Sequence, residues 1–597
     1  MGAELKKRSE IEEKYKWNLD DIIPSQEALE TLVMEIGEAV PVYGTYKGRL
    51  GESAEVLREY LDFDGALDQK FSRLFAYAQQ KSDEDTSVGE NQALVSTAQN
   101  LALKAMEAAA FAEPEILAIP EETMKKYMEN EVLSHYKLLL SRLLAKKEHM
   151  LSEAEERLLA GAGEIAGTPA SVFTLFNNAD IRFPVIKDEN GMDIEVTHGR
   201  FGSLMESRDR SVRKAAFCGY YSVYRQFANT VAAAFEGHLK QACFFAKARK
   251  YSSSRECSLA ANEIPEKVYD NLLEAVNGRL SSLHRYVSVR KAALGLDTLH
   301  MYDLYVPLTE GSDKKYSYEE AKELILRALK PLGEEYGELL KKGFSERWID
   351  VYENKGKRSG GYSNNVYGIH PYVLMSYDDT LNSVLTLAHE MGHSLHSWYS
   401  DRAQSQTYAN YRIFVAEVAS TCNEILVLRY MIGNAENTEE KRYLLNQLLE
   451  RFRATMFRQT MFAEFEWETH QMCRDGIPLT KDTLCKCYHE LNVKYFGSDA
   501  EVDPEIDYEW ERIPHFYYTF YVYQYATGFA AAMAIAGRIL AGDKEVLEGY
   551  FKFLKGGCSM TPVELLKLCG LDMEDAGVVN EALDVFDRLL DEFESCR

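Results

Sequence analysis

Apolar residues recur every three or four positions along most of this 597-residue chain. Because that spacing gathers them on one face of an α-helix, it predicts a succession of amphipathic helices. Pro24 precedes the first of them, and Pro114 and Pro120 lie between two later ones. The pattern places these early helices at 29–36, 54–63, 69–80, 88–111, 121–129 and 133–144.

The helical pattern resumes near residue 202 and continues to 294, and a further helix is predicted over 318–340. The main interruption is a pair of alternating runs joined by Asn190 and Gly191, which is typical of a β-hairpin. A chain of this length is too long for one compact core. We therefore expect at least two lobes, with a boundary at the hairpin that separates an N-terminal helical lobe, 1–195, from the region 196–597.

Extended chain is predicted ahead of residue 380. Residues 357–363 read as a flexible loop rich in hydrogen-bond donors, with Gly360 and Gly361 at its centre, and residues 366–377 look extended. A strand here could pair through its edge with an extended peptide. It could equally be a packing hairpin that orients the next helix, and the residues favour neither interpretation.

Charge, apolar runs and cysteine usage indicate which binding partners and which cellular location to expect. The formal net charge is −26, so binding of nucleic acid through a basic face is not expected. The most apolar late run, 526–537, is shorter than the roughly 20 residues that span a bilayer, so we expect a core helix and no membrane association. The ten cysteines are scattered, which is typical of a reduced, cytoplasmic protein. Cys485, Cys487 and His489 fit no common zinc spacing and are interpreted as structural.

His389, Glu390 and His393 form a His-Glu-x-x-His motif in a segment with helical periodicity. On a helix of about 3.6 residues per turn, positions four apart share a face. His389 and His393 can therefore direct two imidazole nitrogens at one point. Glu390 adjoins the first histidine and can reach a water molecule held there. Two imidazoles and a carboxylate base are the arrangement of zinc hydrolases.

The motif alone is moderately specific, because a catalytic zinc ion usually has three protein ligands. The third histidine of the metzincin pattern would fall at Tyr399, so that pattern fails. His396 would spread three imidazoles along about 10 Å of helix, so we interpret it as an outer-sphere or packing residue. Glu417 lies among small and apolar residues, where a carboxylate is costly unless a cation pairs with it. The structural alternative is a salt-bridged core glutamate. Glu424, two turns later, is the other candidate ligand, or an acceptor for a ligand histidine.

A dense run of tyrosines follows His515. Every buried phenol needs a hydrogen-bond partner, so this density exceeds what a core requires. On a helix, one face would carry His515, Tyr518, Tyr521 or Val522, and Tyr525. Phenol and imidazole donors suit the oxyanion of a tetrahedral intermediate. The alternative is an amphipathic aromatic helix buried between lobes, and packing is the default interpretation for any single tyrosine.

With their flanking segments, these motifs make the chain resemble oligoendopeptidase F, a branch of the thimet-oligopeptidase-like zinc metallopeptidases. The resemblance is carried by 368–372, 387–397, 414–421, 457–466 and 515–528, with weaker similarity at 17–21, 77–86 and 294–307. It spans nearly the whole chain. It implies a mainly α fold, a two-lobed helical ellipsoid that encloses a deep substrate channel, with a small β hairpin or sheet near the zinc helix.

The resemblance also implies roles for individual residues. The implied zinc ligands are His389, His393 and Glu417, with Glu390 as the catalytic base. The oxyanion would be assisted by His515, Tyr518 and Tyr525. Their spacing departs from the thimet-oligopeptidase pattern, so Tyr521 or Tyr523 could take one of these places. The implied substrate contacts are Gly360, Gly361, His370 and Tyr521.

The expected function is therefore that of a zinc-dependent oligoendopeptidase with one Zn²⁺ per chain, held in the region 196–597. It would hydrolyse internal bonds of short unfolded peptides. The nearest alternative is a metallocarboxypeptidase on a related helical fold, and a more distant one is a non-catalytic helical scaffold that binds peptides. Short peptides are the expected partners, and the sequence leaves a monomer and a homodimer both open.

Overall fold

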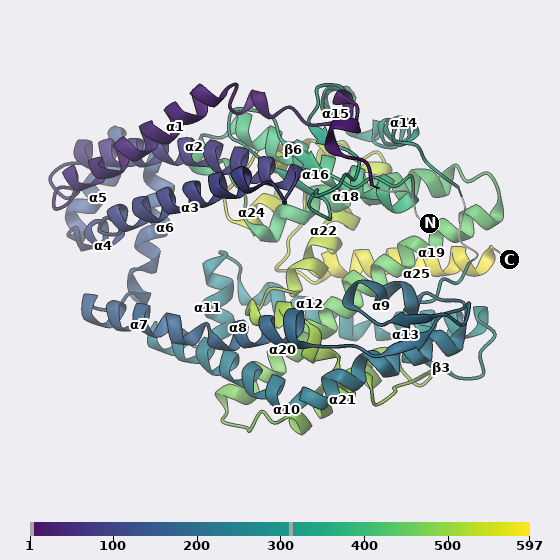
Figure 1. Ribbon diagram of the computed structural model, residues 1–597. Coiled ribbons are helices and arrows are strands. Elements are labelled where there is room, and N and C mark those ends of the chain that lie inside the picture. The colour runs from purple at the N-terminus through teal and green to yellow at the C-terminus, as the bar shows by residue number, and fades with distance from the viewer. Residues whose placement is uncertain (1–4, 310–313, 597) are drawn as a thin grey trace. The chain divides into compact units, whose positions relative to one another are not determined.

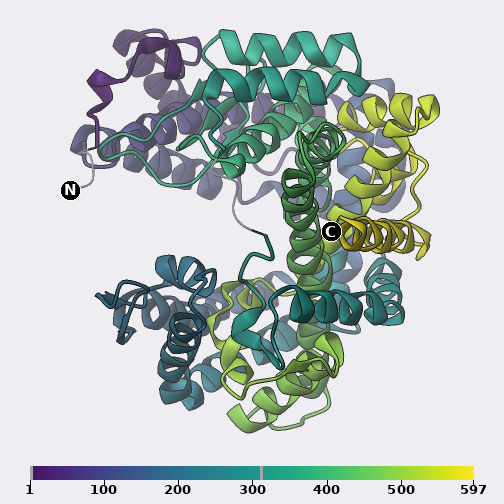
Figure 2. The same cartoon turned by 90° about the vertical axis from the view of Figure 1, so that its right-hand side faces the viewer.

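The computed structural model describes residues 5–309 and 314–596, which fold mainly into helices (Figure 1 and Figure 2). The chain divides into two compact units, each assembled from segments far apart in sequence. The first unit comprises Met1–Glu148, Lys314–Val427 and Arg538–Cys569, and the second comprises His149–Asp313, Leu428–Gly537 and Gly570–Arg597. The predicted mainly α class is confirmed.

The two units do not follow the order of the chain. Helices α18 (Ile413–Gly433) and α22 (Tyr523–Leu540) each begin in one unit and end in the other. Such interleaving arises because a helix buries its apolar face against whichever neighbours the fold supplies, wherever they come in sequence. The division into 1–195 and 196–597 is a different partition of the chain and stays a prediction.

The N-terminal helices of the first unit surround an apolar core. Helix α2 (Ala54–Glu84) runs through the positions of two shorter predicted helices, and α3 (Gly89–Ala109) lies beside it (Figure 1). The two predicted helices are one because Leu67, between them, is buried in the same core. The other helices of this part are α1 (Gln26–Ala39), α4 (Ala112–Ala118), α5 (Glu121–Glu129) and α6 (Lys137–Ala145).

The second unit contains the longest helix, α10 (Arg210–Ala248), and the predicted hairpin. The hairpin is confirmed, since β1 (Val185–Lys187) pairs antiparallel with β2 (Asp193–Glu195) and Gly191 in the turn has φ of 74°. The remaining elements are α7 (Glu153–Ala166), α8 (Thr168–Leu175), α9 (His198–Met205), α11 (Ser254–Ala261), α12 (Glu266–Gly278), α13 (Leu280–Ala293), α19 (Thr438–Arg451), α20 (Arg458–Arg474), α21 (Lys481–Phe496), α25 (Gly577–Ser595) and the parallel pair β3 (Leu299–His300) and β7 (Ala500–Glu501).

The single helix predicted over 318–340 is wrong. The structure has α14 (Tyr318–Ala328) and α15 (Glu334–Ser345) in its place. Pro331 and Gly333 lie between them, and Gly333 has φ of 93°, which no helix interior accommodates. The first unit also contains α17 (Gln406–Ala409), α23 (Lys544–Leu554) and α24 (Pro562–Lys567).

A three-stranded sheet precedes α16 (Leu381–Ala403), the helix that carries the His-Glu-x-x-His motif. Its order is β4 (Ile349–Asp350), β6 (Tyr372–Leu374), β5 (Tyr362–Asn364), with β6 parallel to β4 and antiparallel to β5. Strand β5 therefore forms one edge of the sheet. The Ser363 and Ser394 hydroxyls, 2.9 Å apart, join this edge to α16. The predicted small sheet near the motif helix is confirmed.

Among the residues that the structure describes, one helical segment, Ala154–Asp180, is long and apolar enough by length and composition to cross a membrane. It contains Pro169 at the start of α8, and 11% of its most apolar window is buried. One such segment is weak evidence for a membrane span. The apolar run 526–537, which the sequence analysis considered as a membrane span, lies in α22. Residues 526–536 are all buried there, as expected of a core helix. The ten cysteines are unpaired thiols, and a cytoplasmic location stays a prediction.

Helices α16 and α18 cross with their backbones in contact at Gly392. A methyl group at Gly392 would lie 2.5 Å from Ser420 Cα and 2.8 Å from the Ala419 carbonyl oxygen, and neither backbone atom can rotate aside. We expect Gly392→Ala to lower the free energy of unfolding by about 1–3 kcal/mol, as overpacked cores do. The gain of about 0.5–1 kcal/mol from alanine in a helix interior offsets only part of this cost.

Denaturant unfolding measures the effect of Gly392→Ala. The matched control is Gly337→Ala in α15, because a methyl group there would meet nothing within 4 Å. That control is expected to be neutral or slightly stabilising. Equal stability of the two variants would contradict the close helix crossing.

Candidate metal centre

Helix α16 presents His389 and His393 on one face, one turn apart. The Thr380 side chain caps the helix by accepting a hydrogen bond from the Ser383 N–H, and the helix continues without a break through the motif. The two Nε2 atoms lie 3.1 Å apart. The spacing of four residues thus brings two imidazole nitrogens to one place.

Glu417 reaches the same place from α18. Its Oε2 lies 3.3 Å from His389 Nε2 and 3.7 Å from His393 Nε2. Zinc bonds of about 2.0–2.1 Å in a tetrahedral site hold ligand atoms about 3.3 Å apart, so these three atoms form a triangle of the right size for one ion. Within residues 5–309 and 314–596, these three are the one group of potential metal ligands whose atoms all lie within 4.8 Å of one another.

Glu424 contacts the other nitrogen of His389. Its Oε1 lies 2.5 Å from His389 Nδ1 and accepts a hydrogen bond from it. That contact favours the tautomer with a proton on Nδ1 and leaves Nε2 directed at Glu417. Of the two roles considered for Glu424, the geometry favours an orienting acceptor over a metal ligand.

The charges at this site favour a cation. Burial opposes protonation of His389, but hydrogen bonds and charges from Glu417 and Glu424 raise its pKa to about 10. Burial also acts to raise the pKa of Glu417, yet the two histidines lower it to about 2. Burial and the charge of His389 lower the pKa of His393 to about 4. The carboxylates of Glu417 and Glu424 therefore share the single positive charge of His389. A divalent cation bound there would replace the proton that carries this charge.

Glu390 lies on α16 beside the first histidine and is 7% exposed. Burial raises its pKa to about 7. A carboxyl group with a pKa near neutrality can both accept and release a proton. Strand β5 adjoins it, because Ser363 gives it a backbone hydrogen bond and a methyl group at Gly361 would lie 3.6 Å from its Oε1. The motif glutamate thus lies at the edge of the small sheet.

His396, Cys487 and His489, which the sequence analysis interprets as packing or structural residues, each contact a side chain away from the metal centre. His396 is 1% exposed, and its ring stacks on a tyrosine with centroids 3.7 Å apart. The Cys487 thiol lies 3.1 Å from Glu468 Oε2, whereas His489 Nδ1 lies 2.7 Å from Asp507 Oδ1. The Cys-x-Cys-x-His segment therefore divides its side chains among separate acidic partners.

The helix predicted through the tyrosine run is wrong. Pro514–Tyr517 forms a 3₁₀ turn, and α22 begins only at Tyr523. Between them Phe520 has φ of 55°, in the left-handed region where a right-handed helix cannot continue. The Phe520 N–H donates to the buried Glu466 carboxylate at 2.5 Å, which stabilises this conformation.

The turn still gathers the predicted donors, all of them in the second unit. The Tyr525 hydroxyl lies 3.2 Å from His515 Nε2, and the Tyr521 ring stacks on His515 with centroids 5.8 Å apart. Tyr518 lies 6.1 Å from His515 by ring centroids and is 63% exposed. Burial lowers the pKa of His515, so the neutral imidazole is favoured. Tyr523, considered as a substitute, is 1% exposed and packs in the core.

The two predicted substrate-binding elements of the first unit differ in their surroundings. Gly360 has φ of 97°, so the turn that leads to Gly361 and β5 needs a glycine. His370 packs instead, because its ring stacks on Trp348 with centroids 5.1 Å apart and its Nε2 lies 3.1 Å from Asp21 Oδ2. The glycine loop lies beside Glu390, whereas a substrate contact for His370 stays a prediction.

Asn423 is a residue of this site that the sequence reasoning missed. Its Nδ2 donates to the Ala388 carbonyl at 3.0 Å, and its Oδ1 accepts from the Tyr336 hydroxyl at 2.9 Å. These buried bonds tie α15 and α18 to the turn of α16 next to His389. The available signal is an amide side chain directly before Glu424, on the predicted helix of Glu417.

Comparison with known proteins points to one family. The family model described as peptidase family M3 matches residues 203–585, and that described as oligopeptidase F matches residues 115–183. Oligopeptidase PepF of Bacillus subtilis is 46% identical over 592 residues, which cover 99% of this chain and 88% of that protein. Group B oligopeptidase PepB of Streptococcus agalactiae is 42% identical over 589 residues, or 98% of each chain.

Solved structures are similar to this chain over nearly its whole length. Oligoendopeptidase-F from Enterococcus faecium matches with a TM-score of 0.75 and 39% identity, covering 96% of this chain and 99% of that one. A structure from Chlamydophila abortus matches with a TM-score of 0.94 and 33% identity over the whole of both chains. The similarity therefore extends over both units.

Proposed function

Because the chain belongs to peptidase family M3, we propose that it is a zinc-dependent oligoendopeptidase that cuts internal bonds of short, unfolded peptides. The expected resemblance to oligoendopeptidase F is confirmed at the level of the family. The observation that carries the proposal is the triangle of His389 Nε2, His393 Nε2 and Glu417 Oε2, with the buried Glu390 carboxyl beside it.

The proposed reaction divides between the three ligands and the base. His389, His393 and Glu417 would hold a metal ion, which supplies Lewis acidity toward the peptide carbonyl and lowers the pKa of water. Glu390 accepts a proton from the attacking water and delivers it to the leaving amine nitrogen. Its pKa of about 7 suits both transfers, because the carboxyl releases a proton almost as readily as it accepts one.

The edge of the small sheet supports an extended substrate. Strand β5 is last in the sheet order, and its Ser363 gives Glu390 a backbone hydrogen bond. A methyl group on Gly361, which precedes the strand, would lie 3.6 Å from Glu390 Oε1. A peptide that pairs with this edge would lay its backbone carbonyls along the strand, next to the base. The packing role considered for this sheet holds at the same time, because Ser363 also contacts α16.

His515 and Tyr525 are proposed to donate hydrogen bonds to the substrate carbonyl oxygen as it gains negative charge. Tyr525→Phe removes the hydroxyl that lies 3.2 Å from His515 Nε2 and keeps the ring. We expect kcat to fall by about 10²–10³-fold, as when one oxyanion donor is removed. Steady-state kinetics measure this loss, and metal content should not change because Tyr525 is not in the ligand triangle.

Tyr508→Phe in the same unit is the matched control for Tyr525→Phe, and its kcat should equal that of the wild type. A Tyr525→Phe enzyme whose kcat stays within threefold of the control would assign this tyrosine to packing.

A peptide blocked at both ends tests the proposed function. Mass spectrometry should find internal cleavage that a zinc chelator abolishes and added zinc restores. A metallocarboxypeptidase would spare this peptide, and a non-catalytic scaffold would bind it and leave it intact. Cleavage that persists after complete metal removal would contradict the proposal.

A further inference from the structure

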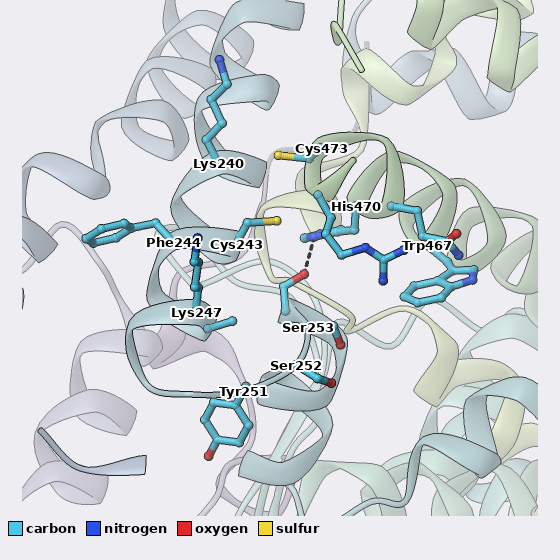
Figure 3. Close-up of a pocket in the computed structure, with 14 residues that line it drawn as sticks. Lys240, Cys243, Phe244, Lys247, Tyr251, Ser252, Ser253, Trp467, His470 and Cys473 are labelled. Atoms are coloured by element: carbon cyan, nitrogen blue, oxygen red, sulfur yellow. Dashed lines mark hydrogen bonds between the residues drawn. The ribbon is translucent and has the colours of Figure 1, made fainter. Parts of the chain in front are cut away.

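A pocket of about 550 Å³ lies in the second unit, between the last turns of α10, the start of α11 and the end of α20 (Figure 3). Its aromatic and cationic lining residues are Phe244, Tyr251, Trp467, Lys240, Lys247 and Arg474. Cys243 from α10 and Cys473 from α20 are also in the wall. These residues have no part in the hydrolysis proposed above.

The two thiols face one another. Cys243 points from α10 toward α20, and Cys473 points from α20 toward α10 (Figure 3). Interaction with Cys473 is the main cause that lowers the pKa of Cys243, and the same interaction raises the pKa of Cys473. Both residues are partly exposed, and both line the pocket.

His470 lies beside the Cys243 thiol as a buried base. His470 is 2% exposed, and its Nδ1 lies 2.8 Å from the Ser254 hydroxyl oxygen. In the part of the chain that the structure describes, its Nε2 has no conventional hydrogen-bond partner. Burial lowers the pKa of His470, and interaction with Cys243 opposes that shift. An imidazole next to a thiol is an arrangement that favours the thiolate.

Two other interpretations of this cluster fit less well. A metal site would need three ligand atoms close together, and the one such set among the described residues is His389, His393 and Glu417. An ordinary buried thiol would behave like Cys257 in the same unit, whose pKa burial raises. Cys243 differs because its sulfur faces hydrogen-bonding groups as well as apolar side chains.

We propose that Cys243 and Cys473 form a redox-active dithiol, in which Cys243 attacks a hydroperoxide and Cys473 resolves the product. His470 takes the thiol proton, and the Cys243 sulfur attacks one peroxide oxygen. An S–O bond forms as the O–O bond breaks, so the sulfur loses two electrons and the peroxide gains them. With hydrogen peroxide, the leaving hydroxide recovers the proton from His470 and departs as water, leaving a sulfenic acid.

The second step closes the disulfide. The Cys473 sulfur attacks the Cys243 sulfur, an S–S bond forms, and the S–O bond breaks. The departing hydroxyl leaves as a second water with the Cys473 proton. The bond joins α10 to α20, which already pack together, and it forms when the two sulfurs come to a separation of about 2.05 Å. A small dithiol reduces this disulfide back to two thiols by exchange and becomes a disulfide itself.

Mass spectrometry of the full-length, metal-loaded protein tests the dithiol. After brief exposure to hydrogen peroxide and alkylation of the remaining thiols, non-reducing peptide mapping should recover the peptides of Cys243 and Cys473 joined together. Dithiothreitol should separate them. In the reduced protein, Cys243 should be alkylated about tenfold or more faster than Cys257, because the thiolate is the reacting form.

Two variants sharpen this test. Cys473→Ser should stop the reaction at the sulfenic acid, which dimedone traps as an adduct on Cys243. Cys257→Ser is the matched control and should form the joined peptide as the wild type does. Absence of the joined peptide in wild-type protein, or equal alkylation rates of Cys243 and Cys257, would overturn the proposal, whether or not either variant folds.

Discussion

Replacing Glu390 with glutamine is expected to lower kcat for a blocked peptide by about 10²–10⁴-fold, the range that general base catalysis contributes. The amide has nearly the same size and can still accept the backbone hydrogen bond from Ser363. What is lost is the group that accepts a proton from water. Because Glu390 is only 7% exposed, bulk solvent is poorly placed to supply a substitute base.

Metal analysis separates a lost base from a lost metal ion. The Glu390→Gln enzyme should bind metal as the wild type does, because the donor triangle consists of His389, His393 and Glu417. The exposed Glu338 on α15 offers a matched control, and Glu338→Gln should leave kcat unchanged. A Glu390→Gln enzyme with full metal and kcat within tenfold of the control would exclude this residue as the base.

Glu417→Ala is expected to have the largest effect on metal binding. It leaves two imidazole nitrogens where three donor atoms lie 3.1–3.7 Å apart. Changes to outer-sphere partners alone cost about 10–100-fold in metal affinity, so we expect a loss of more than about 100-fold, with loss of peptidase activity. Competition with a chromophoric chelator measures the dissociation constant.

Glu424→Gln is the matched comparison for Glu417→Ala. The amide oxygen can still accept the hydrogen bond from His389 Nδ1, but the negative charge is gone. We expect metal affinity to fall by about 10–100-fold, as for an outer-sphere partner. A greater loss in Glu424→Gln than in Glu417→Ala would make Glu424 the third ligand.

The hydrophobic periodicity located most helices but misjudged where some of them end. Two predicted helices are one in α2, because burial of Leu67 in the core outweighs the polar residues around it. The single helix predicted over 318–340 is broken, and Pro331 with Gly333 is a local signal that predicts the break. Boundaries go wrong where tertiary burial or a turn residue overrides the repeat.

The tyrosine run shows a different limit. A helical face was the basis for grouping the phenols with His515, and the segment is not a helix there. The left-handed Phe520 and its bond to Glu466, 54 residues earlier in the chain, form the turn that brings Tyr521 and Tyr525 to the imidazole. The structure does bring these side chains together around His515, but the reason lies in a long-range contact.

Part of the metal centre follows from local sequence, and part of it depends on tertiary structure. The repeat of one helix places His389 and His393 on a common face with Glu390 beside them, so this part follows from the sequence. Which of Glu417 and Glu424 is directed at the Nε2 atoms does not follow from the sequence alone. It is determined where α16 and α18 cross at Gly392, close enough that no side chain fits between the backbones. That contact directs one carboxylate to the Nε2 atoms and the other to Nδ1 of His389, because it sets how far each turn of α18 lies from the motif helix.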